Sequence, residues 1–222
     1  MLILEFAAAC IIAFLIGSVP TGLLVGLVHK IDIRDHGSGN IGTTNALRTL
    51  GKLLGALVFA GDALKGWFVT TLGFGIAASA LSVLDPSIAA SGAWQNELLR
   101  FCIGTSVVMG NVWSVFLRFD GGKGVATSFG ALFGIDPFVA MLGLAFFVLV
   151  VLVSRYVSLG SLIGTFSAPW ISLYWGRGPD VILFAATAFL IVLIRHRENI
   201  ARLKKGTENK LSFRKIHPAP PA

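Results

Sequence analysis

Charged side chains are scarce in this chain of 222 residues, where they make up 13% against roughly 25% in ordinary globular domains. Hydrophobic residues reach 55%, and the mean hydropathy is +0.81. This composition excludes a soluble globular domain. Apolar runs recur along the chain, each about long enough to cross a hydrocarbon core of roughly 30 Å as a helix. We therefore expect an all-α polytopic membrane protein.

Cysteine is also scarce, since the chain has only Cys10 and Cys102. Both lie inside apolar runs, so we expect them to act as small apolar residues, with no disulfide and no acyl thioester. The first segment lacks the basic region of a secretory signal peptide, carries Glu5 and continues as a long apolar run. We interpret it as a permanent span.

Basic residues outnumber acidic ones by 18 to 11, which gives a net charge of +7. Nucleic-acid binding is the usual first suspicion for such a chain. Eight of the 18 basic residues follow the last apolar run, however, and residues 82–96 contain neither Lys nor Arg. This asymmetry predicts a cytoplasmic C-terminus, residues 82–96 outside, membrane lipid as a partner and no nucleic acid.

The hydropathy pattern predicts about seven transmembrane helices with the N-terminus outside. The expected segments are residues 2–28, 52–80, 97–116, 124–134, 138–153, 162–175 and 181–194. The fourth is too short to cross unaided, so we expect a short helix that starts at a Gly-Gly-Lys-Gly loop and packs inside the bundle. Residues 1–210 would form one integral membrane domain, and residues 211–222, with three prolines, a disordered tail.

Two features inside the expected spans have more than one interpretation. Pro20 should kink the first span, either for packing or to shape a substrate groove, and Gly22 and Gly26 should let a neighbouring helix approach closely. Asp62 and Lys65 lie three residues apart on one helix face, within the membrane. They would either neutralise each other or support the polar loop above them.

Three polar islands interrupt the apolar sequence at residues 35–48, 118–127 and 154–161. The predicted topology places all three on the cytoplasmic side, together with the basic tail. The first island contains Gly37, Gly39 and Gly42, several Ser, Thr and Asn side chains, and Arg48. Glycines that expose backbone N–H groups, followed by an arginine, are suited to an anion. A solvated turn between helices is the plainer alternative.

Two known nucleotide motifs do not apply. Residues 37–42 fit the G-x-G-x-x-G pattern, but that fingerprint requires a preceding strand, and here a membrane span precedes it. Lys123 suggests a P-loop, but Gly124 stands where Ser or Thr is required. A glycine cradle at a helix N-terminus with a mobile lysine still suits a phosphate ester. Alternatively, the cations only anchor helix ends, which would leave the glycines unexplained.

Four motifs together resemble the acyl-phosphate-dependent glycerol-3-phosphate acyltransferases. They are Gly37-Ser38-Gly39-Asn40 with Thr44-Asn45 and Arg48, the Phe119–Thr127 stretch, Arg155-Tyr156-Val157-Ser158-Leu159, and the set His196-Arg197-Glu198-Asn199-Ile200, Arg202-Leu203 and Gly206-Thr207-Glu208. The resemblance covers nearly the whole chain. It implies a bacterial inner-membrane enzyme of phospholipid synthesis with its active site facing the cytoplasm. Such an enzyme moves a fatty acyl group from acyl phosphate to the 1-hydroxyl of sn-glycerol 3-phosphate, giving lysophosphatidic acid and phosphate.

Carried over by position, the resemblance assigns two groups of residues. The catalytic candidates are Ser38, Lys123, His196 and Asn199. The candidates for binding substrate phosphates are Gly37, Ser38, Gly39, Asn40, Thr44, Asn45, Arg48, Gly121, Gly122, Lys123, Gly124, Thr127, Arg155, Ser158 and Ser161. We expect no metal and no cofactor, and a possible partner is the soluble enzyme that makes acyl phosphate. The acyl chain should lie against the first three spans and the short helix.

Acyl phosphate is a mixed anhydride, so its transfer requires only electrostatic stabilisation of the leaving phosphate and a well-placed alcohol. We expect direct transfer, with His196 or a substrate phosphate accepting the proton. No histidine is followed five positions later by Asp, so the His-x4-Asp centre of acyl-CoA-using acyltransferases is missing.

The chain departs from the family pattern at three positions. Asn111 stands where His is usual, Ser114 where Pro is usual and Asp120 where Lys is common. Asn111 cannot titrate, and Asp120 would subtract positive charge beside Lys123. The departures allow a second hypothesis, a weakly active homologue that acts as a scaffold. A third, a small organic-anion transporter, predicts inverted repeats, and none is evident in the sequence.

Overall fold

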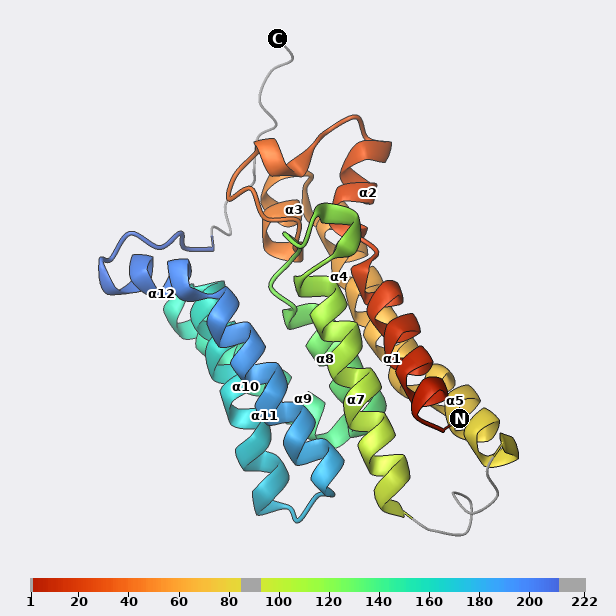
Figure 1. Ribbon diagram of the computed structural model, residues 1–222. Helices are drawn as coiled ribbons and strands as arrows, with labels where there is room; N and C mark the ends of the chain where they lie inside the picture. The colour runs from red at the N-terminus through yellow and green to blue at the C-terminus, as the bar shows by residue number, and fades with distance from the viewer. Residues whose placement is uncertain (1, 85–92, 212–222) are drawn as a thin grey trace.

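The computed structural model describes residues 2–84 and 93–211, and every regular element in this part of the chain is helical. The helices form an elongated bundle (Figure 1). Four segments are long and apolar enough to cross a membrane: Leu4–Val28, Lys52–Val83, Glu97–Leu117 and Pro137–Ser154. A fifth is the bent pair Pro179–Arg195 and Arg197–Lys204. The all-helical membrane class is confirmed, whereas seven crossings remain a prediction.

The expected kink at Pro20 separates α1 (Leu2–Ser18) from α2 (Thr21–Val28). Gly22 and Gly26 follow it, but no helix packs closely against them. Their nearest neighbours are Ile31, Ile33 and Ile41 of the segment that follows α2. The prediction of a helix contact was therefore wrong, because the first polar island folds back over α2. Close helix contacts of the first span lie earlier, where Gly17 meets the backbone of Val107 in α7 (Ala93–Val112) and Gly110 of α7 meets the backbone of Phe14.

The second span is longer than expected. It comprises α4 (Lys52–Phe68), a π-helical turn η2 (Val69–Gly73) and α5 (Phe74–Leu84). The predicted short helix is present as α8 (Val125–Ile135) and lies against α4. Gly66 of α4 contacts the backbone of Thr127, and Gly130 of α8 contacts the backbone of Ala63. These glycines let the two helix backbones approach closely.

Three long helices complete the bundle: α9 (Pro137–Ser154), α10 (Val157–Tyr174) and α11 (Pro179–Arg195). A bend of 62° joins α11 to the short helix α12 (Arg197–Lys204). The third island lies between the expected spans, and its residues Val157 to Ser161 form the first turn of α10. A 3-10 turn, η1 (Ile33–Asp35), leads into the first island, whose second half forms the short helix α3 (Thr43–Thr49), and η3 (Val115–Leu117) follows α7.

The three islands and α12 lie at the same end of the bundle, at the top of Figure 1, and the turn between α10 and α11 lies at the opposite end. Below the islands, Lys65 Nζ lies 2.9 Å from Asp62 Oδ1, and both side chains are buried. Lys65 also donates to the carbonyl of Val19 at 2.9 Å, and Asn111 Nδ2 donates to Asp62 at 3.4 Å. The pair therefore neutralises itself and also joins α4 to α7 and to the break before α2.

Candidate active site

The first island is a glycine loop that leads into α3. Gly37 and Gly39 have φ of 63° and 70°, a left-handed conformation that glycine adopts without strain. The buried Asn45 holds this loop, since its amide donates to the carbonyls of Ile33 (2.8 Å) and His36 (3.0 Å) and its oxygen accepts from the N–H of Ser38 (2.9 Å). Asn45 therefore has no amide hydrogen left for a phosphate.

Among the other polar residues of this island, Asn40 stabilises the loop, whereas the side chains of Ser38 and Arg48 do not. Asn40 Oδ1 accepts from the N–H of Gly42 at 2.9 Å and closes a turn. Ser38 is exposed, and Thr44 is partly buried on α3. Arg48, also on α3, donates from Nη2 to the carbonyl of Asn209 at 3.3 Å, so it reaches the C-terminal segment. Ser38 and Arg48 are the members best placed to meet a ligand.

The second island is a glycine loop fixed by its neighbours. The N–H of Gly121 donates to the backbone carbonyl of Val112 (3.0 Å), and the N–H of Gly122 donates to the backbone carbonyl of Asn111 (2.9 Å). Arg195 donates to the carbonyls of Gly121 (3.0 Å) and Gly122 (3.3 Å). These two glycines therefore position the loop and offer no free N–H group. The free donors are those of the first turn of α8, which begins after Gly124 (φ 79°).

A polar network joins the second and third islands to the tail. Lys123 Nζ donates to Asn199 Oδ1, and Asn199 Nδ2 donates to Glu208 Oε1 at 2.6 Å. Ser158 Oγ donates to the same carboxylate oxygen at 2.8 Å, and Arg202 Nε donates to Oε2 at 2.7 Å. The carboxylate of Glu208 therefore accepts hydrogen bonds from Ser158 of α10 and from Asn199 and Arg202 of α12, and Asn199 links it to Lys123 in the loop before α8.

The remaining candidates lie around this network. Thr127 is fully buried on α8, and Ser161 donates to the carbonyl of Val157 within α10 at 2.9 Å. Arg155 is exposed, and its carbonyl accepts from the N–H of Leu211 at 2.7 Å. Arg155 therefore holds the C-terminal segment in place through its backbone.

Burial controls the charges of the site. It lowers the pKa of Lys123 to about 8, with a further contribution from the positive charge of Arg202. Burial and the charge of Lys123 lower the pKa of His196 to about 4, so its imidazole is neutral at pH 7. Although burial raises the pKa of Glu208, hydrogen bonds from Asn199, Arg202 and Ser158 lower it more, so this group stays ionised.

His196 is held in one orientation at the junction of α11 and α12. Its Nδ1 lies 2.8 Å from the carbonyl of Val192, and the side chain is buried. A carbonyl only accepts hydrogen bonds, so a neutral imidazole here carries its hydrogen on Nδ1. Nε2 is therefore the acceptor.

The three departures from the family pattern make internal contacts. The side-chain amide of Asn111 donates to Asp62, and the hydroxyl of Ser114 donates to the carbonyl of Ser18. Asp120 lies 3.2 Å from Arg195, so its charge is offset there. The expectation that Asp120 weakens the charge at Lys123 is not supported by these contacts.

Three residues of the site were given no role from the sequence: Arg195, Arg202 and Glu208. Arg202 and Glu208 belong to the fourth motif, whereas Arg195 was counted only among the basic residues after the last apolar run. A central role for Glu208 could have been suspected, because it and Glu198 are the only carboxylate side chains after residue 195. Within residues 2–84 and 93–211, no three His, Cys, Asp or Glu side chains are grouped closely enough to hold a metal ion.

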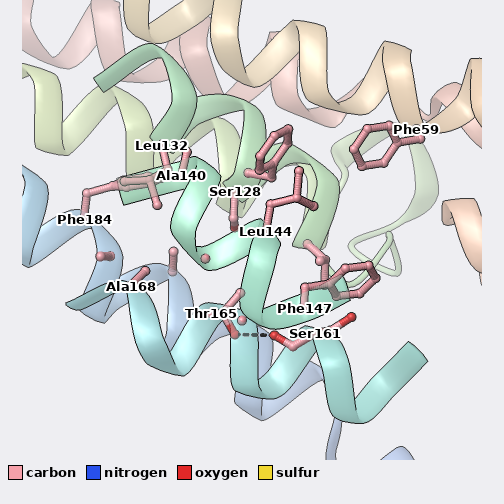
Figure 2. A pocket seen from close by; sticks show the side chains of 16 residues that line it. Phe59, Ser128, Leu132, Ala140, Leu144, Phe147, Ser161, Thr165, Ala168 and Phe184 are labelled. Carbon is pink, nitrogen blue, oxygen red and sulfur yellow. Dashed lines mark hydrogen bonds between the residues drawn. The ribbon is translucent and has the colours of Figure 1, made fainter. Parts of the chain in front are cut away.

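An apolar cavity of about 90 Å³ lies deeper in the bundle (Figure 2). Its walls come from α8, α9, α10 and α11, with Phe59 from α4. We had expected a groove formed by the first three spans and the short helix. Only α8 and Phe59 belong to that set, because α9 and α11 also pack against α8, and α10 packs against both of them. The lining includes Ser128, which directly follows the second island, and Ser161, the last residue of the third.

The fold and the site together define an integral membrane protein that can bind an anionic group at one end of its helical bundle, next to an apolar cavity. Residues 7–206 match the family model for glycerol-3-phosphate acyltransferase. The chain belongs to this acyltransferase family.

Individual relatives agree with the family match. The chain is 39% identical to glycerol-3-phosphate acyltransferase of Geobacter sulfurreducens, over 90% of this chain and 94% of the relative. It is 40% identical to glycerol-3-phosphate acyltransferase 2 of Moorella thermoacetica, over 93% of this chain and 97% of the relative.

The solved structures of PlsY, an integral membrane glycerol 3-phosphate acyltransferase, are similar at 34% identity. The TM-score is 0.80 for its glycerol 3-phosphate form, over 93% of this chain and 96% of PlsY. The TM-score is 0.77 for the lysophosphatidic acid form of PlsY, over 93% of this chain and 95% of PlsY.

Proposed function

We propose that this chain transfers a fatty acyl group from acyl phosphate to the 1-hydroxyl of sn-glycerol 3-phosphate. The products are lysophosphatidic acid and inorganic phosphate, and the reaction is the first step of phospholipid synthesis. The observation that carries the proposal is the convergence of Lys123, Ser158, Asn199 and Glu208 in one hydrogen-bonded network beside two glycine loops. This network brings cations and helix N-termini to one place, as two phosphorylated substrates require.

Within this site, the phosphate binders we favour are Ser38, Arg48, Lys123 and the first turn of α8. Gly37, Gly39, Asn40, Asn45, Gly121 and Gly122 shape the loops, and Thr44, Gly124, Thr127, Arg155, Ser158 and Ser161 complete the surroundings. Asn199 orients Lys123 through its side-chain oxygen. His196 offers a neutral Nε2 that can accept a proton or a hydrogen bond from the attacking hydroxyl.

The reaction requires no cofactor, because the leaving phosphate is already activated in the mixed anhydride. Lys123 and the N–H groups of α8 stabilise the negative charge as the phosphate departs. The proton acceptor is His196 or a substrate phosphate. Direct transfer also agrees with the cysteines, since Cys10 lies on α1 and Cys102 on α7, away from the islands in sequence.

We infer that the enzyme is a seven-span protein of the bacterial inner membrane, with residues 1–210 as one domain, the N-terminus outside and the active site facing the cytoplasm. The support is the gathering of the three islands and the basic residues of α12 at one end. The soluble enzyme that makes acyl phosphate would deliver its product to that side. The predicted disordered tail, residues 211–222, lies outside the described residues except for Leu211.

The test is phosphate release by the purified protein in lipid, supplied with acyl phosphate and glycerol 3-phosphate. Release should depend on glycerol 3-phosphate and disappear in Lys123→Ala. The scaffold hypothesis rests on Asn111 and Asp120, and its Asn111 part is tested in the same assay. A silent wild type with activity restored by Asn111→His would support the scaffold, and silence of all variants would overturn the proposed transfer.

A further inference from the structure

Three hydroxyl groups line the apolar cavity, and they differ in one respect. Thr165 Oγ1 donates to the carbonyl of Ser161 at 2.7 Å, and Ser161 Oγ donates to Val157 at 2.9 Å. Both follow the common pattern in which a helical hydroxyl bonds to the carbonyl four residues earlier. Ser128 Oγ is buried and has no hydrogen-bond partner among the described residues. A buried polar group without a partner is unfavourable, so this exception requires an explanation.

The position of Ser128 supplies that explanation. Ser128 lies on α8, one helical turn after Gly124, and a Cβ atom at Gly124 would be 4.0 Å from Ser128 Oγ. Its hydroxyl is therefore next to the start of α8, where Lys123 and the free N–H groups lie. Ser128 also lines the cavity, among Leu132, Ala140 and Leu144 (Figure 2). It stands between an anion-binding helix N-terminus and an apolar cavity.

Acyl phosphate has the same order of groups. Its phosphate is joined through one oxygen to the carbonyl carbon, and the hydrocarbon chain follows. With the phosphate at the N-terminus of α8, the carbonyl lies within about one helical turn, roughly 5.4 Å. The chain then continues into the cavity, where Phe184 and Ala168 are among the buried residues of the wall.

We propose that Ser128 donates a hydrogen bond to the carbonyl oxygen of acyl phosphate while the first methylene groups of the acyl chain enter this cavity. This inference rests on the proposed function. The hydroxyl oxygen of glycerol 3-phosphate bonds to the carbonyl carbon, and the C=O π electrons move to the carbonyl oxygen, whose negative charge Ser128 stabilises. The C=O bond then re-forms, the bond from carbon to the phosphate oxygen breaks, and phosphate leaves with that electron pair. The hydroxyl proton ends on the departing phosphate.

The test compares Ser128→Ala with Ser172→Ala, a matched control on α10 that does not line the cavity and whose buried hydroxyl already donates to the carbonyl of Ala168 at 2.8 Å. Loss of one donor to a developing oxyanion lowers kcat by on the order of 100-fold. We expect such a fall for Ser128→Ala with the KM for glycerol 3-phosphate unchanged. We expect the activity of Ser172→Ala to remain near that of wild type. Ser128→Ala should fold normally, because it removes an unpartnered hydroxyl.

A second measurement does not depend on turnover. The infrared carbonyl stretch of a bound 13C-labelled long-chain β-ketophosphonate should lie at lower frequency in wild type than in Ser128→Ala. In this non-hydrolysable analogue a methylene group replaces the bridging oxygen, and a ketone carbonyl stands at the position of the acyl carbonyl. An active wild type with equal kcat and equal carbonyl frequency in Ser128→Ala would overturn this inference alone. A wild type that releases no phosphate in the presence of glycerol 3-phosphate would instead overturn the proposed function.

Discussion

At the residue scale, Lys123 has a flexible cationic side chain, and its surroundings lower the pKa of that side chain. It follows two glycines whose N–H groups are bonded to α7, so its backbone is fixed while its side chain reaches Asn199. Burial lowers its pKa to about 8. A lysine near this pKa loses its charge within a range of pH that an assay can reach.

The first prediction concerns this titration. The kcat/KM for acyl phosphate should fall as pH rises through about 8, because the free enzyme then loses the Lys123 proton and the charge that binds phosphate. Lys123→Arg should move the fall to higher pH, since guanidinium stays protonated. The pH profiles of the two enzymes provide the measurement. An identical descending limb in both would assign it to another group.

His196 gives a second prediction. If it accepts the hydroxyl proton, His196→Ala should lower kcat by about 100-fold or more. Because its pKa is about 4, it is neutral throughout pH 5 to 7, and kcat/KM should not rise with pH in that range on its account. His29→Ala is a matched control, since His29 also bonds to a carbonyl four residues earlier but is exposed. Near-normal turnover of His196→Ala would exclude it as the base.

At the element scale, α8 depends on contact between backbones. A Cβ on Gly130 would collide with the carbonyl of Ala63 in α4, whereas one on Gly75 of α5 would meet no atom within 4 Å. Gly130→Ala should therefore destabilise the protein by about 1–3 kcal/mol through overpacking. Gly75→Ala should be neutral or slightly stabilising. Thermal unfolding of the two variants in the same detergent compares them directly, and equal midpoints would contradict the close packing of α8 on α4.

The segment after α12 is fastened by one carboxylate. Glu208→Gln should loosen residues 205–211, because it removes the charge that binds Arg202 and faces Lys123. We expect kcat/KM to fall by about tenfold, or about 1.4 kcal/mol, and trypsin to cleave after Lys204 and Lys205 more quickly. Glu198→Gln on α12 is the control, since that side chain is 76% exposed and its pair with Arg202 spans 3.9 Å. Equal cleavage rates would show that Glu208 does not hold the segment.

At the scale of the whole molecule, the placement of every polar island at one end implies a fixed orientation in the bilayer. A cysteine at Ser87, in the segment predicted outside, should react with a membrane-impermeant maleimide in intact cells. A cysteine at Lys205 should react only after the cells are permeabilised. The opposite pattern would reverse the topology and place the site outside.

Much of this arrangement was predictable from the sequence. Hydropathy determined the helical membrane class, and the break at Pro20 and the short α8 followed from proline, glycine and length. The island motifs identified Lys123, Asn199 and Ser158, which the structure brings together. These features could be read because a bilayer requires long apolar helices, and because loops that approach phosphates require particular residues close together in sequence.

Tertiary packing decided the rest, because it joins residues that are distant along the chain. It showed that Gly22 and Gly26 face a loop, that Gly121 and Gly122 have no N–H group to offer, and that Glu208 ties together Ser158, Asn199 and Arg202. It also placed the cavity among α8 to α11 and left Ser128 as its unpaired hydroxyl. The sequence by itself determined which residues could hold an anion at a membrane, whereas only the packing of the helices determined which of their hydrogen-bonding groups remain free to do so.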